Sequence, residues 1–540
     1  MNGATACIKC LEAEGVKAVF GYPGVAIAPF FNAMLDSDID SILVRTEQNA
    51  GHAASGYYRV SGNVGVCAVT SGPGATNLIT GIATAFADSI PMICITGQVK
   101  SDLIGSDVFQ EADITGAVES FVKYSYLIKD VEDIPRVFKE AFHIATTGRK
   151  GPVLIDIPID IQNASLKKFV YPKEVSLRTY KPTLKGHIMQ IKKLSKALEK
   201  AKKPIVCAGG GVLLSDASKE LAQFVEKFNI PLVHTMMGKG ALSSDHRLNY
   251  GMVGNNGKPY ANQAMNDSDL LIMIGARVAD RAISQPDLIM ENKILVHIDV
   301  DPAEIGKNVE STIPIVGDAK NILSDICEQE IDCNHMQWVD ELEEIRKNAR
   351  PTRKPNPDYV DPAEFIKILT DEMEDRGIYV ADVGQNQMWS AAYANVKQGK
   401  FLTTGGMGTM GYSIPAAMGA RKVLGKDRDI VAVCGDGSFQ MSFMEFATMN
   451  QHDIPVKVVI LKNGYLGMVR EYQHYNYNDK YSVVDLSGSP DTEKIAQAYG
   501  IDYMRIFNME GIREKIRKFL DTEGSGLMEC IIDPYDLVKY

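Results

Sequence analysis

The chain has 540 residues, of which 45% are hydrophobic and 23% are charged, as is usual for soluble globular proteins. Its 57 Lys and Arg against 68 Asp and Glu give a net charge of −11 without a basic stripe, which excludes a general nucleic-acid binder. Apolar runs fall far short of the roughly 20 residues that span a bilayer, and no signal-peptide pattern is present, so we expect a cytoplasmic protein with neither nucleic-acid nor membrane partners.

Two polar, proline-containing segments, 167–185 and 350–362, divide the chain into three blocks. Such segments resist both helix and central strand, so they are predicted linkers. We therefore predict an N-terminal domain over 1–165, a middle domain over 186–338 and a C-terminal domain over 360–540. Nine thinly scattered cysteines indicate reduced thiols. Cys7 and Cys10 have CxxC spacing, for which buried packing is favoured over metal or redox use.

Each block alternates short apolar runs with helical patterns, which is typical of parallel α/β sheets. The expected fold class is α/β, with three domains that each contain a mainly parallel sheet flanked by helices. The middle domain is expected to resemble nucleotide-binding folds. The predicted strands, in chain order, are 41–44, 64–70, 91–96, 152–157, 204–208, 270–274, 294–298, 378–381, 430–434 and 456–461.

The sharpest chemical signal follows the strand predicted at 430–434, where Gly435-Asp436-Gly437-Ser438 stands. Asn463 closes the next strand, so both side chains are expected at the same end of adjacent strands. A carboxylate, an amide oxygen and a backbone carbonyl suit Mg²⁺ that also binds diphosphate oxygens. For a lone Gly-Asp-Gly the alternative interpretation is a tight turn.

This spacing resembles the thiamine diphosphate-binding motif of thiamine-dependent enzymes, although Lys462 stands where that motif has its first Asn. The resemblance implies that Asp436, Asn463 and the carbonyl of Tyr465 bind Mg²⁺. It also implies a separate pyrimidine-binding domain with a catalytic glutamate, which Glu47 supplies. Glu47 would hydrogen-bond N1′ of the aminopyrimidine ring, and proton transfer of this kind contributes roughly 10²–10⁴-fold in rate. Without the motif, a Glu after a strand is more often a solvated end or a helix cap.

Further motifs are similar to the acetohydroxyacid synthase (acetolactate synthase) large-subunit family nearly end to end. They include TSGPGATN at 70–77, FADSIP at 86–91, FQEAD at 109–113 and GGMGTMGYSIPAAMGA at 405–420. The resemblance implies a transferase of branched-chain amino-acid biosynthesis that decarboxylates pyruvate and joins the two-carbon unit to a second 2-ketoacid, giving 2-acetolactate. It also implies a homodimer or tetramer, with Glu47 and Asp436 of one site on different chains, and a regulatory small subunit as partner.

The same resemblance implies which residues contact thiamine diphosphate and the substrate. Met410 would be the bulky side chain that bends thiamine diphosphate, against the alternative of an ordinary core methionine. The substrate residues would be Gln98, Phe109 and Tyr472. Those expected to contact thiamine diphosphate are Pro23, Gly24, Pro73, Asn77, Gln110, Gly384, Gln385, Gly408, Met410, Gly435, Gly437, Ser438, Gly467 and Met468.

The family resemblance further implies FAD in the middle domain. The alternative interpretation of the triple glycine 209–211 is a tight strand-to-helix turn. The sequence departs from the family pattern at Val253, where the family has His, and at Val278-Ala279, where it has Phe-Asp. The expected FAD residues are Arg149, Gly210, Gly211, Thr235, Met236, Gly275, Arg277, Arg281, Asp299 and Asp318.

Other departures lie near the expected substrate. Asn49 replaces a usual Gly, Asn386 replaces a His, and Tyr472 replaces a Trp. Tyr has a smaller aromatic face and a hydroxyl, which favours a changed acceptor preference. The alternative function is a related thiamine diphosphate-dependent decarboxylase or acyltransferase with another aldehyde or ketone acceptor. A non-catalytic paralogue is disfavoured because Glu47 is present, and a nicotinamide dehydrogenase because no GxGxxG follows a strand.

Overall fold

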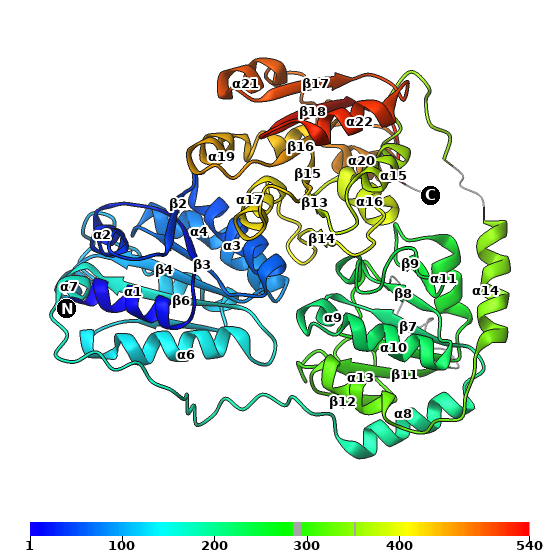
Figure 1. Cartoon of the computed structure of the whole chain (residues 1–540), viewed down its shortest axis with the longest axis horizontal. Helices are drawn as coiled ribbons and strands as arrows, with labels where there is room; N and C mark the ends of the chain where they lie inside the picture. Colours follow the sequence, from blue (N-terminus) through cyan, green and yellow to red (C-terminus); the bar gives the residue numbers. More distant parts are fainter. Residues whose placement is uncertain (284–292, 350–352, 539–540) are drawn as a thin grey trace.

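The computed structural model describes residues 1–283, 293–349 and 353–538 and arranges them in three α/β lobes (Figure 1). Each lobe contains one six-stranded sheet, and every strand pairing is parallel. Helices cover both faces of such sheets, which explains why their strands are continuous apolar runs. The expected fold class is confirmed.

The N-terminal sheet has the strand order β2-β1-β3-β4-β6-β5. Its strands are β1 (Ala18–Tyr22), β2 (Asp40–Leu43), β3 (Gly65–Val69), β4 (Met92–Gln98), β5 (Tyr124–Leu127) and β6 (Pro152–Pro158). Its helices are α1 (Gly3–Ala13), η1 (Val25–Ile27), α2 (Ala28–Met34), α3 (Glu47–Ser61), α4 (Pro73–Ala87), η2 (Ser101–Leu103), α5 (Ile114–Ala117), η3 (Glu119–Phe121), η4 (Val131–Asp133), α6 (Ile134–Thr146) and α7 (Ile159–Asn163).

The middle sheet has the order β12-β11-β10-β7-β8-β9, which is the order of doubly wound nucleotide-binding folds. Its strands are β7 (Pro204–Ala208), β8 (Leu232–His234), β9 (Asn249–Met252), β10 (Leu270–Ile274), β11 (Ile294–Asp299) and β12 (Ile313–Val316). Its described helices are α8 (Ile188–Lys200), α9 (Gly210–Leu214), α10 (Ser218–Phe228), η5 (Met236–Gly238), α11 (Pro259–Asp267), α13 (Ala319–Cys327) and α14 (Met336–Asn348).

The C-terminal sheet has the order β14-β13-β15-β16-β18-β17, which repeats the pattern of the N-terminal sheet strand for strand. Its strands are β13 (Ile378–Ala381), β14 (Lys400–Leu402), β15 (Ile430–Gly435), β16 (Lys457–Lys462), β17 (Asp502–Ile506) and β18 (Gly526–Ile531). Its helices are α15 (Pro362–Glu372), α16 (Gln385–Tyr393), α17 (Ser413–Val423), α18 (Asp436–Phe439), η6 (Phe443–Glu445), α19 (Phe446–His452), α20 (Gly467–Tyr477), α21 (Thr492–Tyr499) and α22 (Ile512–Asp521).

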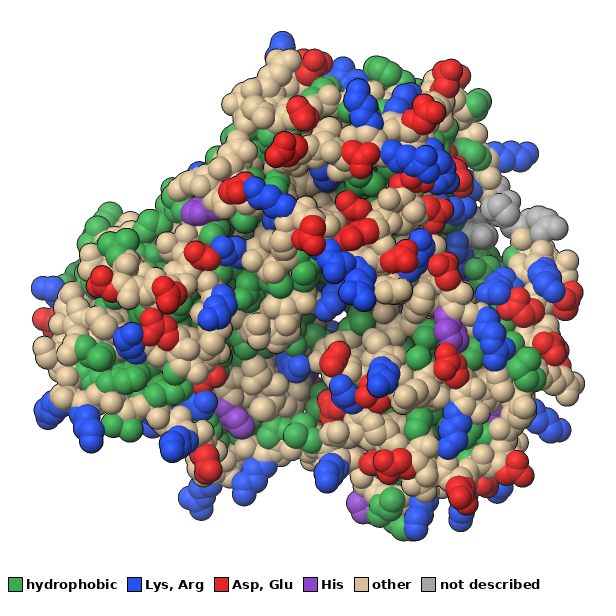
Figure 2. All heavy atoms as spheres, in the orientation of Figure 1, with side chains coloured by type: hydrophobic (Ala, Val, Ile, Leu, Met, Phe, Trp, Pro, Cys, Tyr) green, Lys and Arg blue, Asp and Glu red, His purple; other side chains and the backbone are tan. Residues whose placement is uncertain are grey.

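All ten strands expected from the apolar runs are present, with ends shifted by no more than two residues. The sheets lie within the predicted segments 1–165, 186–338 and 360–540, whose boundaries stay a prediction. Residues 350–352 of the second predicted linker lie outside the described residues. None of the helices in the described ranges has both the length and the hydropathy that crossing a bilayer requires. On the face drawn in Figure 2, basic and acidic side chains are interspersed.

The N- and C-terminal lobes join through α3 and α17, which follow equivalent strands of the two sheets (Figure 1). A Cβ on Gly56 of α3 would lie 1.9 Å from the Ala416 carbonyl oxygen, and a Cβ on Gly419 of α17 would lie 1.9 Å from the Ala53 carbonyl oxygen. The two helix backbones therefore approach as closely as glycine allows. A single hydrophobic core cluster continues across this contact.

We expect Gly56→Ala to destabilise the chain, because the added methyl group meets backbone that cannot rotate away. Overpacking of this kind lowers the free energy of unfolding by about 3 kcal/mol, more than the roughly 1 kcal/mol that alanine gains in helix propensity. Denaturant unfolding measures the change. Gly488→Ala is the control, since its Cβ meets nothing within 4 Å. Equal stability of the two variants would contradict the close helix contact.

Candidate active site and cofactor cavity

Strand order places three groups of predicted residues at one edge of the C-terminal sheet. The order reverses between β13 and β15, and ligands of α/β sheets bind beyond the carboxyl ends of strands at such a reversal. Gly384 and Gln385 follow β13, and Asp436 follows β15. Asn463 follows β16, the neighbour of β15. The structure thus brings together the residues that the sequence pattern placed on adjacent strand ends.

Asp436 and Asn463 have well-defined hydrogen bonds at this edge. Asp436 is 5% exposed, its Oδ2 accepts from the Gly464 backbone N–H at 2.9 Å, and burial raises its pKa to about 6. The Asn463 Oδ1 accepts from the Tyr465 N–H at 2.9 Å. The Asn463 Nδ2 donates to Gln385 Oε1 at 3.0 Å, which fixes the direction of the amide oxygen.

The donor chemistry at this edge fits Mg²⁺ shared with a diphosphate. One carboxylate, one amide oxygen and one backbone carbonyl are hard oxygen ligands, and Mg²⁺ in such sites completes its shell with phosphate oxygens and water. Within the described ranges no three His, Cys, Asp or Glu side chains gather as a metal site. The expected Mg²⁺ ligands do not form such a cluster, because only one of them, Asp436, is a carboxylate.

The backbone around these residues forms a cradle for a polar group. A Cβ on Gly467 would lie 2.2 Å from Gln385 Oε1, so a side chain at 467 would displace the Gln385 amide that orients Asn463. The Oδ1 of Asn386 and the Oγ1 of Thr404 are buried and find no hydrogen-bond partner among the described residues. Because buried polar atoms are nearly always paired, these two orphans fit a cavity whose natural occupant is polar. Both residues line the cavity described next.

A cavity of about 780 Å³ extends between the middle and C-terminal lobes. It is large enough for a cofactor-sized ligand. It is lined by all the residues expected at FAD, including Arg149 of the N-terminal lobe, and by all the predicted C-terminal residues except Tyr472. These are Arg149, Gly210, Gly211, Thr235, Met236, Gly275, Arg277, Arg281, Asp299, Asp318, Gly384, Gln385, Gly408, Met410, Gly435, Asp436, Gly437, Ser438, Asn463, Tyr465, Gly467 and Met468.

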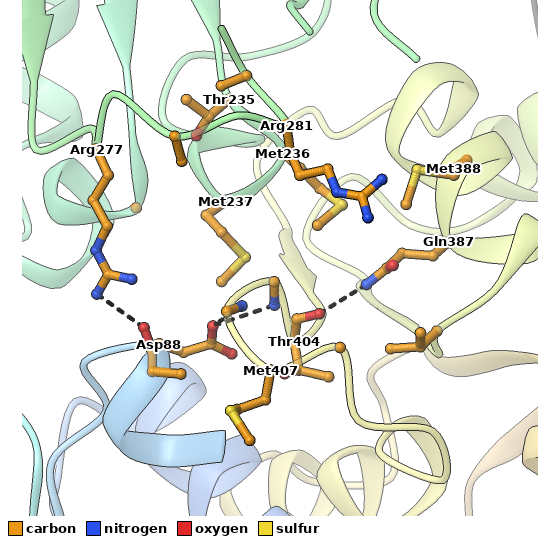
Figure 3. Close-up of a pocket in the computed structure, with 18 of the residues that line it drawn as sticks. Asp88, Thr235, Met236, Met237, Arg277, Arg281, Gln387, Met388, Thr404 and Met407 are labelled. Atoms are coloured by element: carbon orange, nitrogen blue, oxygen red, sulfur yellow. Dashed lines mark hydrogen bonds between the residues drawn. The ribbon is translucent and has the colours of Figure 1, made fainter. Parts of the chain in front are cut away.

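The middle-lobe part of the cavity lies at the reversal between β7 and β10. A Cβ on Gly211 would lie 2.6 Å from Gly275 Cα, so packing of the two strand-end loops already requires glycine at 211. Asp318 caps α13 by accepting from Lys320 N at 3.1 Å, and burial raises the pKa of Asp299. The side chains of Met236, Met237 and Met407 face the cavity between these loops (Figure 3).

The end of α4 at Ala87 and Asp88 contacts the other two lobes beside this cavity (Figure 3), and the contact with the C-terminal lobe is made by the Asp88 carboxyl. Its Oδ1 accepts from the backbone N–H groups of Gly405 and Gly406 at 3.2 and 2.8 Å, and its Oδ2 pairs with Arg59 at 3.0 Å. Arg277 of the middle lobe donates to the adjacent Ala87 carbonyl at 2.9 Å. No local sequence pattern indicates a role for Asp88, because its partners lie 29 residues or more away in the chain.

The predicted residues of the N-terminal lobe form a second, separate group. Glu47 is the first residue of α3, and Asn77 Nδ2 donates to its Oε2 at 3.1 Å. Gly74 lies beside the Glu47 carboxyl, with its Cβ position 3.4 Å from Oε1. The Oγ atoms of Thr70 and Ser71 are buried without a partner in the described part of the chain.

The other predicted residues of this lobe lie near the same loops. Gly24 approaches the Thr70 side chain, and Gly72 approaches Gln110. None of the predicted N-terminal residues other than Arg149 lines the cavity formed by the described residues. Those outside it are Pro23, Gly24, Glu47, Pro73, Asn77, Gln98, Phe109 and Gln110.

The three predicted substrate residues differ widely in exposure. Phe109 is 87% exposed and Tyr472 is 57% exposed. Gln98 is 4% exposed, and its Nε2 donates to the Ala112 carbonyl at 2.8 Å and to Asp156 at 3.0 Å. Both amide hydrogens of Gln98 are therefore engaged, one with the loop that carries Phe109 and the other with Asp156 of β6, and the substrate role of Gln98 stays a prediction.

Lys462, where the motif has its first Asn, forms an ion pair away from the cavity. Its Nζ lies 2.8 Å from Glu529 Oε1, and Glu529 is fully buried. The same carboxylate accepts from Thr492 at 2.7 Å and from Arg505 at 2.5 Å. This replacement therefore leaves the Asp436 and Asn463 hydrogen bonds intact.

Comparison with known families gives three matches that together cover most of the chain. The N-terminal TPP binding domain of thiamine pyrophosphate enzymes matches residues 1–117. The central domain of thiamine pyrophosphate enzymes matches residues 191–326. The C-terminal TPP binding domain of the same enzymes matches residues 382–530.

The sequences of several known proteins align with almost the whole chain. A probable acetolactate synthase large subunit of Methanocaldococcus jannaschii is 45% identical, over 99% of this chain and 92% of its own length. An acetolactate synthase of Arthrospira platensis is 40% identical over 98% and 94%. An acetolactate synthase large subunit of Corynebacterium glutamicum is 42% identical over 96% and 84%.

We expect Asp88→Ala to weaken the junction of the N- and C-terminal lobes. The change leaves the Arg59 charge buried without its carboxylate, and such a loss lowers the free energy of unfolding by about 3 kcal/mol. Denaturant unfolding followed by Trp338 and Trp389 fluorescence measures it. The exposed Asp102→Ala serves as control. If the free energy of unfolding falls no more in Asp88→Ala than in Asp102→Ala, the result would argue against the proposed junction.

Asp156 predicts a pH-dependent stability. Burial raises its pKa to about 7, against hydrogen bonds from Thr96 and Gln98 that lower it. The native state therefore keeps a proton that the unfolded chain loses near pH 4. The native state binds more protons between these values, so stability falls as pH rises through this range. Asp156→Asn removes this dependence.

Thermal unfolding at pH 5 and pH 8 tests this expectation. The Asp156→Asn variant is expected to gain stability relative to the unmodified chain at pH 8. An identical pH dependence of the two proteins would show that Asp156 ionises normally.

Proposed function

Since the chain belongs to the acetolactate synthase large-subunit family of thiamine pyrophosphate (thiamine diphosphate) enzymes, we propose that it completes each active site from two copies of itself. It is a thiamine diphosphate-dependent acetolactate synthase subunit, and the reaction joins two 2-ketoacid molecules with loss of one CO₂. With pyruvate as both donor and acceptor the product is 2-acetolactate.

We propose that Asp436, Asn463 and the Tyr465 carbonyl bind Mg²⁺, and that the metal fixes the cofactor's diphosphate in the cradle of the C-terminal lobe. When bound, thiamine diphosphate supplies an electron sink for the pair left behind as CO₂ departs. The orphaned Asn386 and Thr404 atoms support a polar occupant there. Met410, which lies on the wall of the same cavity, restricts the conformation of whatever fills it.

Glu47 is the proposed catalytic residue for proton transfer. Its carboxyl would hold the proton at N1′ of the aminopyrimidine, so that the neighbouring amino group works as a base. Asn77 orients the Glu47 carboxyl by a 3.1 Å hydrogen bond. The unpartnered hydroxyls of Thr70 and Ser71 support a polar ring placed beside Glu47.

One observation carries the proposal that two chains share each site. The cavity contains the predicted Mg²⁺ ligands but not Glu47 or its neighbours in the described structure. A two-fold dimer pairs the Glu47 group of one chain with the Asp436 cavity of its partner, and gives two equivalent sites. The exposed Phe109 and Tyr472 then face the interface between chains, where substrate would enter. Association of two dimers into a tetramer is compatible with this arrangement.

We also propose FAD in the middle-lobe part of the cavity. Arg277, Asp299 and Asp318 supply groups that suit phosphates and nucleotide hydroxyls at strand ends. The methionines at 236 and 237 supply flexible apolar surface for a flat ring. A regulatory small subunit is a further proposed partner, because the Methanocaldococcus and Corynebacterium relatives are named large subunits.

We expect Glu47→Gln to lower acetolactate formation from pyruvate by about 10²–10⁴-fold, because the amide holds no transferable proton. The assay uses purified protein with thiamine diphosphate and Mg²⁺, and the bound flavin is recorded by its visible absorption. Glu119→Gln, an exposed site of the same lobe, is the matched control.

Normal turnover by the Glu47→Gln variant would overturn the proposed role of Glu47. Absence of flavin from active protein would overturn the FAD proposal alone. Competition between pyruvate and 2-ketobutyrate, measured with Tyr472→Trp, reports whether Tyr472 selects the acceptor.

A further inference from the structure

A buried carboxylate of the C-terminal lobe contacts the chain on both sides of Glu47. Glu445, the last residue of η6, is fully buried. Its Oε1 accepts from the backbone N–H of Arg45 at 2.9 Å and from Asn49 Nδ2 at 2.8 Å. Its Oε2 accepts from Thr448 Oγ1 at 2.6 Å. Arg45 and Asn49 each stand two residues from Glu47. The Glu445 carboxylate is therefore hydrogen-bonded to the chain on both sides of Glu47.

The first turn of α3 depends on this external contact. The N-cap residue of α3, Thr46, makes no capping hydrogen bond through its side chain in the described structure. Asn49 lies in the first turn and is 1% exposed, with its side chain directed to Glu445. Since Glu47 begins the same turn, its backbone is fixed by the residues on either side of it.

Further hydrogen bonds extend the contact along α19. The Leu43 N–H donates to His452 Nε2 at 3.0 Å, and Arg45 donates from its guanidinium to Gln451 at 2.8 Å. Burial lowers the pKa of His452, which agrees with a neutral ring that accepts. The segment 43–49 is therefore hydrogen-bonded to the C-terminal lobe from one end to the other.

The charge of Glu445 suits this position. Burial raises its pKa, while the hydrogen bonds from Thr448, Asn49 and Arg45 and the Arg45 charge lower it. An ionised carboxylate accepts at both oxygens, so all three donors are paired. A neutral amide in its place has one oxygen only, and its amide hydrogens would face donors.

We propose that Glu445 and Asn49 are positioning residues that set the place of the Glu47 carboxyl. The inference rests on the proposed function of Glu47. Asn49 stands where the resembled family usually has Gly, so this chain adds a side-chain hydrogen bond to the positioning of Glu47.

The test compares Asn49→Ala, Glu445→Gln and the double variant with the full-length protein. Asn49→Ala is expected to lower kcat by about 10-fold and Glu445→Gln by about 100-fold, with KM for pyruvate within about twofold of its original value. Residues that act through one contact are not additive, so the double variant is expected to match Glu445→Gln.

A second readout does not depend on activity. Hydrogen exchange of the backbone amides at 44–50, measured by mass spectrometry on protein without added cofactor, is expected to quicken in Asn49→Ala. Asp40→Asn is the matched control, because it removes a contact between the same lobes, the 2.5 Å pair with Lys422, which involves neither Glu445 nor Asn49. The control is expected to change neither kcat nor this exchange.

Several results would overturn the inference. These are an unchanged kcat in Asn49→Ala, an equal loss in Asp40→Asn, or additive losses in the double variant. If Glu445→Gln fails to fold, the kcat and the hydrogen exchange of Asn49→Ala alone decide whether the positioning role stands. Inactivity of Glu47→Gln together with full activity of Asn49→Ala would overturn the positioning role and leave the proposed function standing. Full activity of Glu47→Gln would overturn the proposed function itself.

Discussion

Helices α3 and α17 pack backbone against backbone, and this contact decides where the two halves of the site lie. Gly56 and Gly419 leave no room for a side chain between the helices. Glu47 begins α3, so the same contact holds the Glu47 group against the C-terminal lobe of its own chain. In the proposed account Glu47 cannot reach the cavity of its own chain without breaking a buried core, and a partner chain supplies the missing half.

The repeated strand order of the outer lobes gives this arrangement its symmetry. The N- and C-terminal sheets follow the same pattern, and equivalent helices meet at the centre. The continuous segment from α18 to α19 carries Asp436 at its start and Glu445 directly before α19. If Glu47 works in the partner's site, Glu445 links the Mg²⁺-binding edge of one site to the proton-transfer group of the other.

Local sequence patterns predict much of this fold and part of its site. Buried strands such as β7, β10 and β13 are continuous apolar runs, so their bounds follow from the sequence. Short edge strands such as β14 were not expected, because three residues carry too little apolar pattern. Asp436 and Asn463 were predictable as neighbours because parallel strands end at the same edge of a sheet.

Residues whose partners are distant in sequence, within one lobe or in another, escaped prediction. Asp88, Asp156 and Glu445 act through partners that are distant in sequence, and no local spacing indicates them. Gly211 shows the opposite case. The sequence pattern suggested a ligand-binding glycine there, but the close approach of Gly275 already requires glycine for packing. The roles of Phe109 and Tyr472 depend on what covers their exposed faces in an assembly, which the sequence of one chain does not state.

The most direct measurement mixes two inactive variants, Glu47→Gln and Asp436→Asn, unfolds and refolds them together, and assays acetolactate formation. If each site takes Glu47 from one chain and Asp436 from the other, a mixed two-fold dimer contains one intact site. Random pairing then restores about a quarter of the original activity. A mixture as inactive as its two components would contradict the shared site, and with it the account of how α3 and α17 divide the enzyme.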